Sequence, residues 1–345
     1  ALASGIQVLF LSSNYFFGQL AEIEELYKGF QPQVVHSTLH KSRLRGKLHK
    51  LLYLRKHVLV ESFVTMPYAE DRIKARRQNS IKLFLHKAIE SMLNSLAVDH
   101  FIAISNEVKK HMVDELYFLE PGKISIIYRG RKENAFLNQR KELRARYARE
   151  FGFDESAIVF IHIGRQDYPK NHVFLLRAFL KLHDQNTSGH QVVLLCLGRQ
   201  GGTTPQIKAL MDPHTLGASI VFPGHRPDVQ QLLAQGDIFV FPSLFEGLGG
   251  AVIEAKAAQL PLIVSDLPVF RELLVQEEEA IFVSTRDVDE WTSKMHVLAA
   301  DVVRRRSMGA LNLSSFKKRF LIESVNSEML TLYRTFLDEG SATGN

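Results

Sequence analysis

The sequence predicts an α/β protein made of two doubly wound domains, each with a parallel sheet covered by helices. A chain of 345 residues is too long for one ordinary hydrophobic core. Short apolar segments alternate with helical patterns along its whole length, which is typical of parallel sheets. A polar, charged segment at residues 129–157 separates two such series. We therefore expect domains at residues 1–135 and 136–320, followed by a helical segment at 321–345.

The strands of both domains are expected where branched and aromatic residues cluster. In the first domain they are expected at residues 7–11, 33–37, 57–61, 100–105 and 123–128, with helices that include 21–30 and 81–98. In the second domain they are expected at residues 158–163, 192–197, 219–222, 238–241, 262–265 and 280–283. Helices are further expected at residues 140–150 and 321–337.

A glycine loop in the second domain lies between two carboxylates and leads into a helix. Pro242 ends the expected strand, Glu246 and Gly247 follow, and the helix begins near Gly249 and Gly250. Unpaired N–H groups in the first turn of a helix attract anions, and glycine lets a ligand approach them closely. Leu248 lies inside this loop, and Glu254 lies one turn inside the helix. The pattern suits a nucleotide-sugar, whose diphosphate lies between two groups that carry hydroxyls.

Ligands of open parallel sheets bind beyond the carboxyl ends of the strands. The strand at 158–163 is followed by Gly164, Arg165 and Lys170, and these two cations can both meet a diphosphate. The alternative for the cations is a structural salt bridge. The strand at 219–222 is followed by Gly224 and His225, which form either a wall for a nucleobase or a surface turn.

Two further motifs resemble ligand sites, but their spacing favours plainer interpretations. The glycines between Gly198 and Gly202 lack the spacing of a dinucleotide fingerprint, so we expect a turn near the ligand. Asp287 and Asp289 form the Asp-x-Asp pattern of some metal-dependent sugar transferases, yet they precede a helical pattern, so capping is favoured. The histidines lack metal-ligand spacing, and the single cysteine, Cys196, belongs to an apolar run typical of a core.

The net charge of +6 is concentrated in the first half, where residues 1–150 carry 25 Lys and Arg against 15 Asp and Glu. The segment from Lys41 to His57 has seven of these cations, no acid and five interleaved leucines. The favoured interpretation is a solvated helix packed by its leucines. The alternatives are contact with an anionic membrane surface or acceptor and, least favoured, with nucleic acid. No apolar run could cross a bilayer, so we expect a cytoplasmic protein, peripheral on the inner membrane face if the basic segment binds lipid.

The motif PSLFEGLGGAVIEA, with GRQDYPK upstream and FIAIS and YRG in the first half, resembles the retaining glycosyltransferases of family 4, of bacterial type, which have the GT-B fold. The resemblance covers nearly the whole chain. It implies two Rossmann-like domains with a cleft between them, an acceptor held mainly by the first domain and a nucleotide-sugar donor held by the second. It also implies that the final helix crosses back to the first domain.

The resemblance assigns roles to individual residues. Arg165 and Lys170 match the pair that grips the donor diphosphate, Glu254 the glutamate that binds ribose hydroxyls, and Glu246 the glutamate beside the transferred sugar. Leu248, Gly249 and Gly250 match the loop that touches sugar and phosphate. Fixed positive charge would stabilise the leaving group, so we expect no metal or other cofactor. The expected reaction moves a sugar to a glycan or lipid-linked acceptor with retention of configuration.

Three departures from the family pattern bear on activity. The sequence opens near what resembles the third strand, so about 30 to 50 residues, one βαβ unit, are expected to be absent, which would leave the first domain truncated and its sheet with a gap. Gln259 stands where glycine is usual at a helix end, and the segment Glu61-Ser62-Phe63 lacks the histidine of many relatives. The rival hypothesis is therefore a degenerate relative that binds nucleotide-sugars without catalysis. A nicotinamide oxidoreductase is disfavoured by the missing fingerprint.

Overall fold

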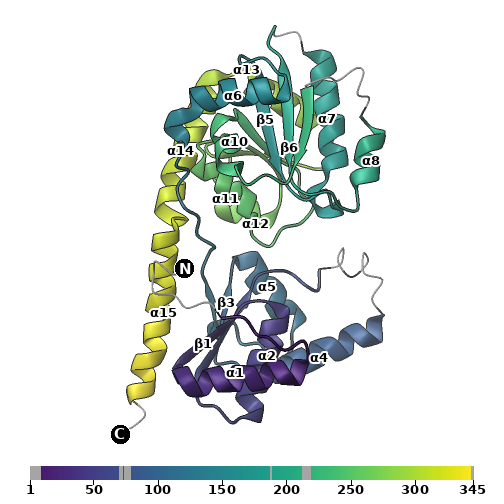
Figure 1. Ribbon diagram of the computed structural model, residues 1–345. Coiled ribbons are helices and arrows are strands. Elements are labelled where there is room, and N and C mark those ends of the chain that lie inside the picture. The colour runs from purple at the N-terminus through teal and green to yellow at the C-terminus, as the bar shows by residue number, and fades with distance from the viewer. Residues whose placement is uncertain (1–8, 70–72, 74–78, 187–188, 212–218, 343–345) are drawn as a thin grey trace. The chain divides into compact units, whose positions relative to one another are not determined.

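The computed structural model describes residues 9–69, 73, 79–186, 189–211 and 219–342. Contacts within the chain divide it into two compact units. Unit 1 comprises Ala1–Ile127 and Glu328–Asn345, and unit 2 comprises Tyr128–Ser327. Each unit contains a parallel sheet with helices around it, so the predicted α/β class is confirmed (Figure 1). Among the described residues, no helix is both long and apolar enough to cross a membrane.

Unit 1 is built on a sheet of four described strands that are neighbours in chain order. They are β1 (Val34–Ser37), β2 (Val58–Phe63), β3 (His100–Ala103) and β4 (Ile124–Ile126). The helical elements are α1 (Phe16–Phe30), α2 (His40–Leu52), α4 (Ser80–Ala97), α5 (Asn106–Glu115) and η2 (Pro121–Lys123). All strand pairs are parallel, and β2, between β1 and β3, is buried along nearly its whole length. The gap expected in this sheet is absent from the described strands.

Two expectations for unit 1 are wrong. Leu9, Phe10 and Leu11 form no strand, and the rest of the predicted strand at 7–11 lies outside the described residues. The side chain of Phe10 is 90% exposed, so this apolar run lacks the packing that would hold it to a sheet. The basic segment is helical only as far as Leu52, because Leu54 adopts a left-handed conformation (φ 49°) that an α-helix cannot contain.

Unit 2 is built on a sheet in the order β10-β9-β8-β5-β6-β7. The strands are β5 (Ile158–Ile163), β6 (Val192–Leu197), β7 (Ile220–Gly224), β8 (Ile238–Phe241), β9 (Leu262–Ser265) and β10 (Ala280–Val283). Their positions match the sequence prediction, apart from a small shift in β7. The order reverses between β5 and β8, and this switch point is where open α/β sheets bind ligands. The loops after β5 and β8 therefore define the candidate site.

The helices of unit 2 connect these strands and lie around the sheet (Figure 1). They are η3 (Leu137–Gln139), α6 (Arg140–Phe151), η4 (Tyr168–Lys170), α7 (His172–Gln185), α8 (Thr204–Ala209), α10 (Val229–Gln235), α11 (Gly250–Ala257), α12 (Pro268–Leu273), α13 (Val288–Ala300) and α14 (Val302–Arg319). Every residue of β6 is buried. Cys196 is therefore a core residue, as predicted, and burial raises the pKa of its thiol.

The last helix, α15 (Ile322–Ala342), begins in unit 2 and is counted with unit 1 from Glu328 onward. Tyr333 on this helix forms a hydrogen bond with His36 on β1, with 2.5 Å between the phenol oxygen and Nδ1. The other ring nitrogen of His36 is 2.7 Å from the Ser62 hydroxyl on β2. One histidine therefore ties the end of the chain to two strands of unit 1.

Gln259 follows α11 and has a φ of 58°, which confirms the left-handed conformation expected at this position. Its backbone also packs closely on α14, because a Cβ atom added to Gly309 would lie 2.3 Å from the Gln259 carbonyl oxygen. The side chain of Gln259 is exposed and compensates for little of the backbone strain.

We predict that Gln259→Gly raises the free energy of unfolding by about 0.5–1 kcal/mol, because glycine adopts this conformation without a Cβ clash. The measurement is urea denaturation followed by circular dichroism. Gln185→Gly, at an exposed position in the last turn of α7, is the matched control and should lower stability by a similar amount. A loss of stability in both variants would contradict the account.

Candidate functional site

The loop after β5 begins at Gly164, where the chain has no room for a side chain. A Cβ atom there would lie 2.9 Å from Cγ of Lys170 and 3.1 Å from Nε2 of His162. The short helix η4 then places Lys170 directly before Asn171, whose φ of 53° turns the chain into α7. The local geometry thus folds the Lys170 side chain back over the end of β5.

The loop after β8 leads to α11 through a glycine that no other residue could replace. Gly249 has a φ of 80°, and a Cβ atom there would lie 2.6 Å from the ring of Phe270. It serves as the N-cap of α11 without a capping side chain, so the first turn of the helix presents its N–H groups. Leu248 is buried, so its side chain anchors the loop to the interior of unit 2.

The two loops are joined to each other at the switch point. The Leu244 N–H donates to the Pro169 carbonyl oxygen at 2.9 Å, and the Lys170 ammonium forms an ion pair with Glu246. The hydroxyl of Ser243 also donates to Glu246, at 2.9 Å. The ammonium lies 4.7 Å from the centre of the Phe241 ring, at the end of β8. The structure therefore brings Lys170 and Glu246 together, although they are far apart in the sequence.

Glu254 is paired with an arginine that sequence reasoning did not select. Nε of Arg131 donates to Glu254 at 2.8 Å, and its Nη2 lies 2.4 Å from where a Cβ atom of Gly250 would be. Arg131 is held by backbone hydrogen bonds to Phe320 and Ile322. The YRG motif, residues 128–130, directly precedes Arg131 in the sequence. Only the fold shows that the guanidinium of Arg131 lies beside the first residue of α11.

The described contacts of the remaining predicted residues lie outside this cluster. The guanidinium of Arg165 is 66% exposed and pairs with Asp167 at 3.0 Å, and among the described residues no ion pair joins it to Glu246. Gly224 has a φ of 78°, and its carbonyl accepts from the Gly198 N–H at 2.9 Å. His225 is exposed next to it, beside a shallow hollow that also contains Arg226 and Asp228.

The plainer interpretations of two motifs are supported. The turn at Gly198–Gly202 packs on the loop after β5, since a Cβ atom at Gly198 would overlap the Gly164 carbonyl and the Gly202 N–H donates to Asp167. Asp287 caps α13 by accepting from the Asp289 and Glu290 N–H groups at 2.9 and 3.0 Å. Among the described residues, no set of three or more His, Cys, Asp or Glu is arranged to hold a metal ion.

Comparison with known proteins relates the chain to glycosyltransferases. The model for glycosyl transferases group 1 matches residues 157–301, which contain the whole candidate site except Arg131. The chain is 25% identical to the UDP-Gal:alpha-D-GlcNAc-diphosphoundecaprenol alpha-1,3-galactosyltransferase of Escherichia coli, over 74% of this chain and 70% of that one. The chain is therefore similar to glycosyltransferases over these residues, and it has the GT-B fold.

Other relatives agree with this placement. The chain is 26% identical to the O-antigen chain mannosyltransferase RfbU of Salmonella typhimurium over 61% of its length, and it spans about half of that relative, 54%. Its fold matches that of Anabaena Alr3699/HepE in complex with UDP and glucose, with a TM-score of 0.74 and 16% identity over 92% of this chain and 81% of the other.

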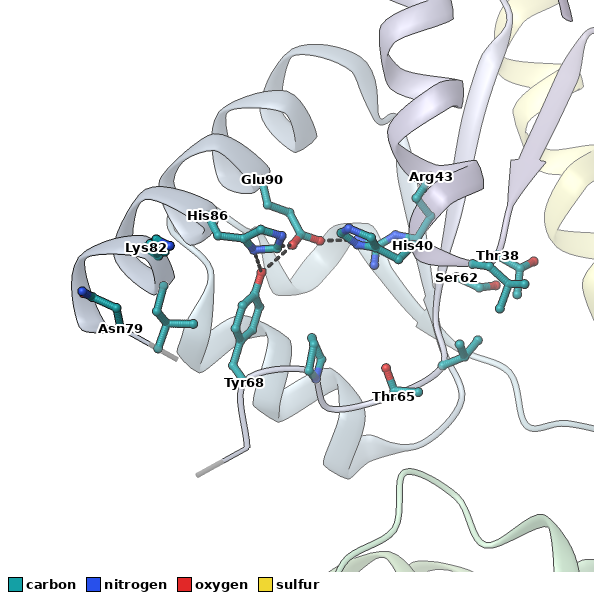
Figure 2. Close-up of a pocket in the computed structure, with 14 residues that line it drawn as sticks. Thr38, His40, Arg43, Ser62, Thr65, Tyr68, Asn79, Lys82, His86 and Glu90 are labelled. Atoms are coloured by element: carbon teal, nitrogen blue, oxygen red, sulfur yellow. Dashed lines mark hydrogen bonds and ion pairs between the residues drawn. The ribbon is translucent and has the colours of Figure 1, made fainter. Parts of the chain in front are cut away.

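Unit 1 contains a cavity of about 770 Å³ between β2, α2 and α4. In Figure 2, Thr38 and Ser62 lie at its strand end, and Asn79 and Lys82 lie at the far end of α4. Its wall is mixed: apolar residues such as Leu39, Val64 and Leu83 line it together with hydroxyl, imidazole and ammonium groups, and these polar groups can bind hydroxyl or phosphate oxygens.

A buried charge network forms the floor of this cavity. Arg43 donates to Glu61 at 2.9 Å and to Glu90 at 2.7 Å, and Lys47 donates to Glu61 at 3.1 Å. The Tyr68 hydroxyl donates to Glu90 as well (Figure 2). Burial opposes ionisation of Glu90, but the charge of Arg43, the hydrogen bond from Tyr68 and the charge of Lys47 together outweigh it, so the pKa of Glu90 is lowered.

This network revises the interpretation of the basic segment. Arg43 and Lys47 point inward, Lys50 pairs with Asp99, and Arg55 pairs with Glu24. Four of the seven cations therefore have acidic partners within unit 1. The predicted solvated face is wrong for Arg43 and Lys47, because buried carboxylates that were distant in the sequence attract them.

Two buried histidines lie under Lys170 in unit 2. His162 donates from Nδ1 to the Val240 carbonyl at 2.9 Å, which links β5 to β8, and its ring meets His172 edge to face at 4.5 Å. Burial, followed by the charge of Lys170, lowers the pKa of His172 to about 4. Both imidazoles are therefore neutral at neutral pH, and Lys170 carries the positive charge of this layer.

We predict that His172→Phe reduces the loss of stability in acid. The unfolded histidine binds a proton near pH 6.5 and the folded one only near pH 4, so wild-type stability falls as pH drops through this window. The difference should reach about 3 kcal/mol, at about 1.4 kcal/mol per pKa unit. The measurement is the free energy of unfolding at pH 7 and pH 4. His296→Phe, at an exposed position on α13, should keep the wild-type pH dependence.

Proposed function

We propose that this chain transfers a sugar from a nucleotide-diphosphate sugar to an acceptor hydroxyl, with retention of configuration, and that the donor binds at the ends of β5 and β8. The observation that carries the proposal is the convergence of Lys170, Glu246 and the N-terminus of α11 at the switch point. The UDP and glucose named in the HepE structure support a donor of this class.

The proposed chemistry follows from the charges in this site. When the bond between the anomeric carbon and the phosphate oxygen breaks, the electron pair leaves with the nucleoside diphosphate, and the acceptor oxygen forms the new bond and releases its proton. Lys170, Arg165 and the N–H groups of α11 would stabilise the leaving diphosphate. A bound diphosphate would replace Glu246 as the partner of Lys170, which would free this carboxylate to face the sugar.

Glu254 and Arg131 are proposed to bind the ribose end of the donor. They line a hollow of about 280 Å³ with Asn134, Pro227 and Gln230, next to the hollow at His225. A carboxylate at such a place can accept hydrogen bonds from two neighbouring hydroxyls. The Gly224–His225 turn, which shares Pro227 with this hollow, is the proposed neighbour of the base.

The acceptor is proposed to be a glycan or a lipid-linked saccharide bound in the cavity of unit 1. The hydroxyl, imidazole and ammonium groups of its wall can bind the hydroxyls of such a ligand, and the Escherichia coli relative is named for a diphosphoundecaprenol-linked acceptor. Contact of the basic segment with an anionic membrane would involve Lys41, Arg45 and Lys56, which have no acidic partner among the described residues, because the other four cations are paired within unit 1.

The rival function, donor binding without transfer, is favoured by one observation. Glu246 and Glu254 are both engaged by cations, so the site is neutralised by its own side chains. A panel of nucleotide-sugars tested by thermal shift, followed by release of nucleoside diphosphate from the best donor, separates the two functions. A donor at about 100 times its Kd should stabilise the fold by about 2.7 kcal/mol under either hypothesis, whereas turnover occurs only with an enzyme.

We predict that Lys170→Ala lowers the rate of nucleoside diphosphate release by more than about tenfold, because it removes a fixed charge that faces the leaving group. Lys181→Ala is the matched control, since Lys181 also forms an ion pair in unit 2, with Asp289. Its rate should equal that of the wild type. Unchanged turnover in Lys170→Ala, with the fold intact by circular dichroism, would contradict the assignment.

We also predict that turnover persists after metal removal. Protein cations supply the charge that a divalent ion supplies in other transferases, so dialysis against EDTA should leave the rate within about twofold of its starting value. The assay is the same release of nucleoside diphosphate. Loss of activity that Mg²⁺ or Mn²⁺ restores would show that the proposed charge balance is wrong.

A further inference from the structure

Arg131 lies along one face of α11, and its guanidinium reaches from the second turn of this helix to the first. Nε donates to Oε1 of Glu254 at 2.8 Å, while Nη2 lies beside Gly250. Gly250 and Glu254 are four residues apart and therefore share a face of the helix. The hollow of about 280 Å³ lies at the same face, lined by Arg131, Glu254 and Ala257 among others. A ligand in this hollow would therefore meet the guanidinium as well as the carboxylate.

The glycine at residue 250 makes room for this arginine. A Cβ atom there would lie 2.4 Å from Nη2 of Arg131, which is closer than a real Cβ atom approaches such a neighbour. The backbone conformation of Gly250 does not itself require glycine, since the positive φ belongs to Gly249. Glycine is also a poorer helix former than alanine. The position therefore gives up helix stability and leaves space that the guanidinium occupies.

The backbone and the side chain of Arg131 are both held in place. Its N–H donates to the Phe320 carbonyl oxygen at 2.8 Å, and its carbonyl oxygen accepts from the Ile322 N–H at 3.0 Å. Nη1 donates to the Gly130 carbonyl oxygen at 3.0 Å. Two of the three guanidinium nitrogens thus have partners. Nη2 forms no hydrogen bond with any described residue, so both of its N–H groups are available to a ligand.

The guanidinium carries its charge to a place where a cation is normally disfavoured. The N-terminal end of a helix is positive, and α11, which is described in full, has no acidic residue in its first turn and no capping side chain at Gly249. Glu254 pairs with Arg131, and Glu246 pairs with Lys170. The two carboxylates thus balance the two side-chain cations, and the positive end of α11 is left for a bound anion.

We propose that Arg131 binds the diphosphate of the donor through Nη2 while its Nε holds Glu254 in place for the ribose. The proposal rests on the proposed function and extends the role of Arg131 from the ribose to the phosphates. The ligand class is a nucleoside diphosphate, free or as part of a nucleotide-sugar. Its ribose and diphosphate are adjacent groups, and Glu254 and Gly250 lie on adjacent turns of one helix face. One charged guanidinium can therefore serve both groups.

The alternative is a structural salt bridge, in which Arg131 only holds Glu254. The two roles differ in what the arginine contributes to the binding of a nucleoside and of its diphosphate. An arginine that acts only through Glu254 contributes equally to both, because both ligands contain the ribose. An arginine that binds phosphate contributes more to the diphosphate. The ratio of the two affinities therefore separates the roles.

The test is titration of the full chain, followed by NMR, with the diphosphates of uridine, guanosine and adenosine and with the three nucleosides. For the pair that the wild type binds best, Arg131→Gln should weaken the nucleoside diphosphate at least about tenfold more than the nucleoside, because a charge-assisted hydrogen bond to phosphate is lost. Arg131→Lys keeps the charge without the planar fork, so it should lose less than Arg131→Gln.

Gly250→Ala tests the same contact without removing the arginine. The added methyl group would displace Nη2, and alanine is the better helix former, so the variant should fold at least as stably as the wild type. Its affinity for the nucleoside diphosphate should fall at least about fivefold. Gly250→Ala combined with Arg131→Gln should lose no more than Arg131→Gln alone, because both substitutions act on one contact. Additive losses would overturn the proposal.

Arg304→Gln is the matched control. The side chain of Arg304 is 31% exposed, as is that of Arg131, and it also forms an ion pair in unit 2, with Glu277. Glu277 precedes β10 and so lies at the amino ends of the strands, whereas the donor site lies at their carboxyl ends. This variant should bind the nucleoside and its diphosphate as the wild type does.

Equal losses of nucleoside and nucleoside diphosphate affinity in Arg131→Gln would overturn the proposal and leave a structural salt bridge. Unchanged affinity for the diphosphate would overturn it as well. Failure of the proposed function gives a different result, in which the wild type binds the diphosphate with the expected dependence on Arg131 but releases none from any nucleotide-sugar. A wild type that binds none of the three diphosphates would remove both.

Discussion

The ion pair between Lys170 and Glu246 is the contact on which the candidate site depends, because it joins the two loops at the point where the sheet order reverses. The loop after β5 supplies the cation, and the loop after β8 supplies the carboxylate and the start of α11. Neither loop is a site by itself. Lys170 lies over the ring of Phe241 and above neutral imidazoles, so its charge has a defined position that a diphosphate can use.

Unit 1 is organised by a different electrostatic constraint. Glu61, on β2, is completely buried, and Arg43 and Lys47 must turn inward to pair with it. Arg43 also holds Glu90, and this second pair fixes which side of α4 faces the interior. The apolar residues of α4 are then left outside. The exposed apolar side of α4 is thus a direct consequence of the buried charge of Glu90 on its opposite side, and the two features are expected to be lost together.

Much of unit 2 could be predicted from the sequence, because buried parallel strands are short apolar runs and Pro242, Gly249 and Gly250 mark the turns that follow. The left-handed Gln259 was also predictable, since a helix end required that conformation. Arg131 was not, because its contact with Glu254 joins residues 123 positions apart in the sequence. Residues 9–11 and α4 differ from the sequence pattern for a similar reason. A hydrophobic pattern shows which residues can be buried, but contacts between distant residues decide which of them are buried. In α4 these contacts are ion pairs, and they determine which side of the helix faces the interior.

The most direct test of the donor site is hydrogen–deuterium exchange of the backbone amides with and without a nucleotide-sugar that the chain binds. The account predicts slower exchange in the segments around Gly164–Lys170 and Gly247–Val252, where the two loops meet, and little change in β1 to β4. Protection confined to the cavity residues of unit 1, with none at the start of α11, would contradict the central claim.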